Sequence, residues 1–155
     1  CSGGFAATAI QYVAKNGIEA LADYPFTGTP GKCQYSADKA LKITSGVGTV
    51  PPKNVTALRA AIYQQPTLVM IEADQAAFQF YTDGVISSGC GALVNHVVTA
   101  VGYGAYQGQE SFTIRNTWGP NFGLKGYVYI SANTTINNGL GACGIFTSPI
   151  YPQKI

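Results

Sequence analysis

Apolar residues recur at helical spacing near the start of the chain. Between residues 5 and 16, Phe5, Ala9 and Val13 fall four positions apart, so their side chains lie along one face of a helix. Gly17 follows, and glycine commonly stands just past a helix end. The pattern therefore predicts a helix over residues 5–16 with one apolar face.

A second helical pattern follows a proline pair. Asn54 has the side-chain oxygen of a good N-cap, Leu58 and Ile62 are spaced to face inward, and Pro66 marks the end. This predicts a helix from Asn54 through residue 65. The residues between the two helices, rich in Pro, Gly and Asp, predict loop and extended chain.

After Pro66 the pattern changes to short apolar runs separated by glycine-rich turns. Several such runs favour an antiparallel barrel. The chain thus divides into a helix-and-loop part and a mostly β part. The predicted strands cover residues 67–73, 96–103, 110–116, 126–131 and, as a last strand, 143–147, with a helical turn over 76–81.

Charge is scarce in this chain. Charged residues make up 10% of the sequence, hydrophobic residues 46%, and the formal net charge is +2. Such a small charge, with no basic cluster, argues against nucleic acid or an anionic membrane as partner. No apolar run approaches the ~20 residues of a membrane span.

The cysteines favour disulfides over a metal site. They are widely spaced, no Cys-x-x-Cys pair occurs, and only one histidine is present, so a zinc site is disfavoured. Disulfides would place the protein in an oxidising compartment. Asn54 and Asn133 begin sequons that permit glycosylation. The four cysteines are Cys1, Cys33, Cys90 and Cys143.

Three residues have ordinary interpretations when taken singly. His96 opens an apolar run and fits a satisfied histidine at a strand end. Asn116 fits a turn residue after a strand. Trp118, the sole tryptophan, fits a core residue.

Together they resemble the active-site motifs of papain-like cysteine peptidases. Residues 95–98 (Asn-His-Val-Val) with 101–104 (Val-Gly-Tyr-Gly) resemble the histidine motif, and residues 114–119 (Ile-Arg-Asn-Thr-Trp-Gly) the asparagine motif. Further landmarks follow in the family's order over essentially the whole chain. They are residues 1–5 (Cys-Ser-Gly-Gly-Phe), 23–26 (Asp-Tyr-Pro-Phe), 78–81 (Phe-Gln-Phe-Tyr), 126–127 (Gly-Tyr) and 143–145 (Cys-Gly-Ile).

The resemblance implies an α+β, papain-like fold. Residues 1–48 would form the remainder of a helical left lobe, and residues 49–155 an antiparallel β-barrel right lobe carrying His96 and Asn116. By resemblance, His96 is the general base and acid, and Asn116 orients its ring without adding charge. Trp118 would cover their hydrogen bond and keep water off it. The resemblance implies no cofactor and no metal.

The family's nucleophilic cysteine stands in a Cys-Gly-Ser-Cys-Trp segment on a central helix. No such segment occurs in the 155 residues. We therefore expect a cysteine-type endopeptidase component whose nucleophile is supplied by an N-terminal segment absent from this chain. Alone, the chain should not cleave peptides.

The resemblance also assigns the cysteines. Cys90 and Cys143 would pair with each other. Cys1 and Cys33 would have their partners in the missing segment, and could tether an N-terminal chain of the same peptidase. That segment would include the helix against which the helix over residues 5–16 packs. We therefore expect a second chain, a partner or a dimer mate to cover this apolar face, because soluble monomers rarely expose such a patch.

A peptide or protein substrate would lie in a cleft. Gly3 and Gly4 match glycines that let an extended peptide backbone approach. Asn95, next to His96, stands where aspartate is common, and Phe122 replaces an expected tryptophan. The second subsite is apolar, which predicts Leu, Val or Phe at the second residue before the cut. Its positions are Phe5, Ala6, Met70, Val94, Val97 and Ser148, which could also be ordinary core residues.

Two other functions remain open from sequence. An inactive pseudoprotease would use the cleft to hold a partner, although it has no chemical need for both His96 and Asn116. An unrelated, disulfide-stapled secreted domain would place those two residues far apart. For the peptidase we expect a lysosomal, vacuolar or secreted location.

Overall fold

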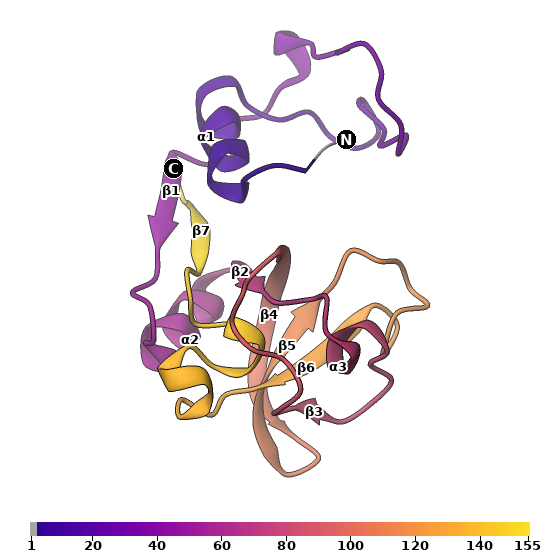
Figure 1. Cartoon of the computed structure of the whole chain (residues 1–155). Coiled ribbons are helices and arrows are strands. Elements are labelled where there is room, and N and C mark those ends of the chain that lie inside the picture. Colours follow the sequence, from indigo (N-terminus) through magenta and orange to yellow (C-terminus); the bar gives the residue numbers. More distant parts are fainter. Residues whose placement is uncertain (1–2) are drawn as a thin grey trace. The chain divides into compact units, whose positions relative to one another are not determined.

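The computed structural model describes residues 3–155 and divides the chain into two compact units. The first comprises Cys1–Gly48 with Pro152–Ile155, and the second Thr49–Tyr151. Each unit is described here by itself. Figure 1 shows a helix-and-loop unit and a unit built mostly of strands.

The first unit contains helix α1 (Ala6–Asn16) and a short 3-10 helix, η1 (Ala37–Lys39). As predicted, α1 ends at Gly17, whose φ of 85° is left-handed and whose N–H donates to the Val13 carbonyl at 2.8 Å. A side chain at Gly17 would come within 3.1 Å of the Leu41 carbonyl oxygen. Only glycine combines that backbone angle with so close an approach.

This unit buries little apolar surface. Among its described residues, Ile10 is the one buried apolar side chain, at 9% exposure. Phe5 is 82% exposed and Phe26 is 88% exposed. Leu21, Leu41 and Ile43 are exposed as well. The apolar face predicted for the first helix is therefore largely open to solvent.

The second unit begins with helix α2 (Val55–Gln64). The predicted cap is confirmed, because Asn54 Oδ1 accepts the Ala57 N–H at 2.9 Å. Leu58 and Ile62 are buried, as their spacing predicts. Figure 1 shows α2 and α3 (Ala76–Gln79) on opposite sides of the strands.

Within residues 3–155, seven strands form one sheet in the order β1-β7-β2-β4-β5-β6-β3. The pairs β2–β4, β4–β5 and β5–β6 are antiparallel, as predicted. The pair β3–β6 is parallel, and no strand was predicted over the residues of β3. The strands are β1 (Gly46–Thr49), β2 (Thr67–Ile71), β3 (Val85–Ile86), β4 (His96–Tyr106), β5 (Gln109–Arg115), β6 (Tyr127–Ser131) and β7 (Ile150–Gln153).

One face of this sheet forms the core. Along β2, the side chains of Val69 and Ile71 are buried while Leu68 and Met70 are half-buried, which is the alternation of a strand with one covered face. Phe112 on β5 packs edge-on against another core ring, that of Phe146, with 5.8 Å between centroids. The half-buried face carries Met70 and Val97, which are discussed below.

The strand predicted over residues 143–147 is wrong. Two 3-10 helices, η2 (Ile136–Gly139) and η3 (Ala142–Gly144), occupy this region instead. Cys143 has a φ of 53°, which breaks any extended run. Ile145 and Phe146 are both buried because the chain turns into the core, not because a strand is covered on two faces.

The disulfide prediction is confirmed for Cys90 and Cys143. Cys33 is exposed and forms no disulfide with another described residue, and Cys1 lies outside the described residues. Within residues 3–155, no helix is long and apolar enough to cross a bilayer. The same residues contain no group of three or more His, Cys, Asp or Glu side chains suited to a metal ion.

Candidate active site

Strand register brings His96 and Asn116 to the same end of the sheet. His96 opens β4, and Asn116 directly follows β5, the antiparallel neighbour in which Arg115 pairs with Thr99. His96 Nε2 lies 2.9 Å from Asn116 Oδ1, a hydrogen-bond distance. Asn116 is 6% exposed, so this contact is largely out of water.

A second bond fixes the orientation of the Asn116 amide. The Thr117 backbone N–H donates to the same Oδ1 at 2.8 Å. A backbone N–H can only donate, so the atom that faces both Thr117 and His96 must be the oxygen. His96 therefore donates from Nε2, and its Nδ1 is left as the ring's acceptor in the neutral tautomer.

Aromatic rings surround this pair. Trp118 lies beside the imidazole, with 5.2 Å between ring centroids and 33° between planes. Phe78 is fully buried and meets Trp118 edge-on at 5.4 Å. Phe122, also buried, meets Trp118 edge-on at 5.2 Å. Trp118 itself is 44% exposed, so it is a partly open wall of the site and not a core residue.

The predicted substrate-binding residues of the second unit gather near the start of β4. Met70 and Val97 are cross-strand partners on the half-buried face of β2 and β4. Val94 packs closely against Gly144. A Cβ added at Gly144 would lie 2.9 Å from the Val94 side chain. Ser148 is exposed and lies just before β7, the other neighbour of β2.

Asn95 forms hydrogen bonds to the backbone at the end of β2. Its side-chain oxygen accepts the Ala73 N–H at 2.9 Å, and its own N–H donates to the Ile71 carbonyl at 2.9 Å. These bonds tie the residue before His96 to the end of β2. They hold the start of β4 in place through the backbone and the neutral side chain of Asn95.

The remaining predicted cleft residues belong to the first unit. Gly3 has a φ of 84°, and a Cβ added at Gly3 or Gly4 would meet no atom within 4 Å. Phe5 precedes α1 and Ala6 begins it. These glycines present open backbone, which suits the approach of another chain.

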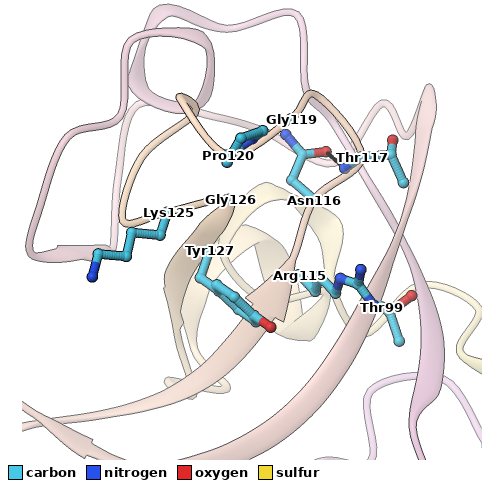
Figure 2. Close-up of a pocket in the computed structure, with 9 residues that line it drawn as sticks. All are labelled: Thr99, Arg115, Asn116, Thr117, Gly119, Pro120, Lys125, Gly126 and Tyr127. Atoms are coloured by element: carbon cyan, nitrogen blue, oxygen red, sulfur yellow. Dashed lines mark hydrogen bonds between the residues drawn. The ribbon is translucent and has the colours of Figure 1, made fainter.

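A pocket of about 600 Å³ lies on the other side of Asn116. Thr99, Arg115 and Tyr127 line it from β4, β5 and β6, where they pair in register across the sheet. Figure 2 shows these side chains below Asn116, with Lys125 at the opposite side of the pocket. The lining also includes Thr117, Gly119, Pro120 and Gly126.

Among the described residues, the largest pKa shift is that of Tyr106, at the far end of β4. The Tyr106 hydroxyl donates to Asp83 Oδ1 at 2.7 Å, and this bond raises the pKa of Tyr106 to about 12. The same bond, with a further bond from the Gly84 N–H, lowers the pKa of Asp83. This pair closes the end of the β4–β5 hairpin, away from His96.

Comparison with known proteins identifies the family. Residues 1–153 match the model of the papain family of cysteine proteases. The chain is 40% identical to chymopapain from Carica papaya over 155 residues, which span 99% of this chain and 44% of that protein. It is 36% identical to mexicain from Jacaratia mexicana, and there covers 70% of the protein.

Solved structures of cysteine proteases also match this chain. The bromelain protease from Ananas comosus, in complex with the E64 inhibitor, superposes with a TM-score of 0.90 at 31% identity. The match covers 100% of this chain and 72% of bromelain. The ragweed pollen allergen Amb a 11, a cysteine protease in its proform, superposes with a TM-score of 0.90 at 35% identity. This match covers 47% of the allergen chain. The chain therefore belongs to the papain family of cysteine proteases and has the papain-like α+β fold.

Sequence reasoning missed three parts of this neighbourhood. The Thr117 N–H is a backbone group, which no residue pattern shows. Phe78 was noted only as a family landmark, although its ring supports both His96 and Trp118. Arg115 and Tyr127 stand twelve positions apart and become neighbours only through the β5–β6 register.

Proposed function

We propose that this chain is the part of a papain-like cysteine endopeptidase that carries the catalytic histidine and asparagine. The observation that supports the proposal is the hydrogen bond between His96 Nε2 and Asn116 Oδ1 at 2.9 Å. It joins two residues, twenty positions apart, in the arrangement that thiolate chemistry requires.

In this proposal the nucleophilic cysteine lies on polypeptide outside the 155 residues and faces His96 Nδ1. The imidazole takes the thiol proton, giving a thiolate and an imidazolium. The thiolate attacks the peptide carbonyl carbon, and the imidazolium protonates the leaving amine as the C–N bond breaks. Water then attacks the thioester, gives its proton to His96, and releases the carboxylic acid and the thiol.

Asn116 acts in this scheme as a positioning residue. Because its amide is neutral, it fixes the imidazole without competing with the thiolate as the counter-charge of the imidazolium. The Thr117 bond keeps the oxygen, not the nitrogen, toward His96. Trp118 shields one side of the ring, which strengthens the bond by lowering the local dielectric.

The proposed substrate is an extended peptide. Met70 and Val97 offer an apolar surface with no charged group between them, so we propose a preference for Leu, Val or Phe at the second residue before the cut. Gly3, Gly4, Phe5 and Ala6 would contribute backbone and apolar contacts. Ser148 and Val94 would complete the subsite.

The proposed partner is the polypeptide that carries the nucleophile, joined through Cys1 and Cys33 if it is a separate chain. Cys33 is exposed and therefore accessible for such a bond. The Cys90–Cys143 disulfide fits an oxidising compartment. We propose a vacuolar, lysosomal or secreted location.

The test uses the complete protein and the 155-residue chain side by side. With a peptide amide of Leu-Arg type, the complete protein should show hydrolysis that E64 abolishes, since bromelain was captured with that inhibitor. The 155-residue chain should show none. His96→Ala should lower kcat by about 10⁴-fold or more while the protein still folds. If the complete protein neither hydrolyses the amide nor reacts with E64, the chain belongs to a pseudoprotease.

A further inference from the structure

The two asparagine sequons of the chain have different surroundings in the structure. Residues 133–135 (Asn-Thr-Thr) lie in the loop that follows β6, and all three are exposed. Residues 54–56 (Asn-Val-Thr) lie at the start of α2, where Asn54 is the cap and the other two belong to the first helical turn. The same kind of triplet therefore occurs once in an exposed loop and once in a packed helix.

In the loop triplet, the hydroxyl of the third residue contacts the amide of the first. Thr135 donates to Asn133 Oδ1 twice, from its backbone N–H at 2.9 Å and from its Oγ1 at 2.9 Å. A sequon requires Ser or Thr at this third position, so the hydroxyl is the group that distinguishes it from other triplets. Both bonds use Oδ1, and within the described residues Nδ2 of Asn133 forms no hydrogen bond. The nitrogen that would receive a glycan is therefore not engaged.

In the helix triplet, the amide and the middle residue both serve the fold. Asn54 Oδ1 accepts the Ala57 N–H at 2.9 Å and so caps α2. Val55 packs against the hydrophobic core of the second unit. Among the described residues, no hydrogen bond joins the Thr56 hydroxyl to Asn54. An enzyme that takes up this triplet would have to break the cap and lift Val55 from the core.

Asn133 lies far from the active-site pair. The Asn116 N–H donates to the Gly126 carbonyl at 2.9 Å, directly before β6 begins. The five residues of β6 span about 13 Å between their ends. Beyond them, the Ala132 N–H still bonds to the Glu110 carbonyl, so the chain continues in the same direction. A bulky group on Asn133 would therefore stand at the opposite end of β5 and β6 from Asn116.

We propose that Asn133, and not Asn54, carries an N-linked glycan that stands clear of the active site. The inference goes beyond the proposed function and rests on it only for the vacuolar, lysosomal or secreted location, because proteins on that route meet the enzyme that attaches such glycans. A glycan also suits the composition of this chain. Charged residues make up only 10% of the sequence, and a bulky hydrophilic group adds solvated surface.

The donor class is an oligosaccharide joined to a polyprenyl diphosphate. Asn133 Nδ2 attacks the anomeric carbon of the first sugar and forms a C–N bond, while the C–O bond to the diphosphate breaks. The diphosphate leaves with the electron pair of that bond, and the nitrogen loses one proton to a base of the transferring enzyme. The amide carbonyl is unchanged, so Oδ1 can keep both of its bonds from Thr135 in the modified protein.

The test uses the complete protein, produced through the secretory route of a eukaryotic host. Peptide N-glycosidase removes an N-linked glycan and converts its asparagine to aspartate, so mass spectrometry of the peptides identifies the modified position. Peptides from residues 1–155 should lose the mass of one glycan, with the conversion at position 133 and none at position 54. An unmodified Asn133, or equal modification of Asn54, would overturn the proposal.

Matched variants at exposed positions test the part played by the hydroxyl. Thr135→Ala removes it and should abolish the glycan, whereas Thr135→Ser keeps a hydroxyl and should retain the glycan. Thr56→Ala is the control in the helix triplet and should leave the pattern of modification unchanged. A glycan that persists on Asn133 in the Thr135→Ala variant would show that the modification does not depend on the sequon, and the proposal would be wrong.

The position of Asn133 also predicts the effect of the glycan on activity. Asn133→Gln, produced in the same host, removes the acceptor and should leave kcat/KM for a peptide amide within about twofold of the glycosylated protein. A rise beyond that range would show that the glycan obstructs the cleft and would overturn its placement. Reaction with E64 is measured in parallel, so that a glycosylated but unreactive protein refutes the proposed function alone, and a reactive protein without the glycan refutes this inference alone.

Discussion

Asn116 Oδ1 accepts two hydrogen bonds, from the Thr117 N–H at 2.8 Å and from His96 Nε2 at 2.9 Å. The first is local and sets the amide; the second reaches across the β4–β5 pair and sets the imidazole. Removing the amide should therefore free the ring without unfolding the protein.

On the proposed function, Asn116→Ala in the complete protein should lower kcat by about a hundredfold or more, because the imidazole loses its fixed tautomer. Asn121→Ala, an exposed asparagine in the following loop, is the matched control and should leave kcat within about twofold. Steady-state kinetics on a peptide amide measures both. Equal rates for the two variants would remove Asn116 from the mechanism.

Substitution of Trp118 should mainly lower activity, whereas substitution of Phe78 should mainly lower stability. Trp118→Ala opens the His96–Asn116 bond to water and should lower kcat about tenfold with modest loss of stability, since Trp118 is 44% exposed. Phe78→Ala leaves a cavity in the core and should cost about 3–5 kcal/mol of unfolding free energy. Denaturant melts and kinetics on both variants check this. A larger stability loss for Trp118→Ala would contradict the assignment of Trp118 as an open wall.

The Cys90–Cys143 disulfide closes a long loop, with 53 positions between its ends. A double Cys90→Ser, Cys143→Ser variant should lose about 4 kcal/mol of unfolding free energy on the chain-entropy estimate. Because the loop begins at Cys90, shortly before His96, hydrogen exchange at residues 91–95 should also rise. Unchanged exchange there would mean that the bonds of Asn95 to Ala73 and Ile71 hold the start of β4 without the disulfide.

Gly123 should not tolerate a side chain. Its φ is 49°, and an added Cβ would meet the Tyr127 carbonyl oxygen at 2.6 Å and Tyr81 Cδ1 at 2.8 Å. Gly123→Ala should cost about 2 kcal/mol or more in a thermal or denaturant melt. Gly4→Ala is the control, because open space surrounds Gly4. Similar costs at both positions would show that the clash is relieved by movement of the loop.

The Asp83–Tyr106 pair makes a pH-dependent prediction. The bond that raises the pKa of Tyr106 to about 12 stabilises its neutral form, so Asp83→Asn should move that pKa back toward its usual value of about 10. NMR titration of the Tyr106 ring carbon measures the change. The bond's contribution in the wild type is present at neutral pH and is lost as Asp83 protonates at acid pH, because the folded pKa of Asp83 is lowered. An unmoved Tyr106 pKa in the variant would assign the shift to burial.

Features of the fold that depend on a local sequence signal were predicted correctly. Asn54 and Gly17 define helix ends through their own side chain or backbone, and both behaved as predicted. The strand prediction for residues 143–147 was wrong because an apolar run has the same composition in a buried strand and in a chain that turns through a core. The positive φ of Cys143 could not be read from its identity.

Other features depend on register, which no single segment contains. The row of Thr99, Arg115 and Tyr127 exists only after three strands have paired, and a shift of one residue would turn the side chains to the other face. The parallel edge between β3 and β6 likewise could not be deduced, since β3 has only two residues. The pairing of His96 with Asn116 was predicted through their motifs, and its geometry came from the structure.

The small buried surface of the first unit has a thermodynamic consequence. With Ile10 as its one buried apolar side chain among the described residues, this unit gains little hydrophobic free energy to offset the entropy of ordering its loops. Its folding would then be linked to association by mass action, and its apparent stability would rise with the concentration of whatever polypeptide covers Phe5 and α1.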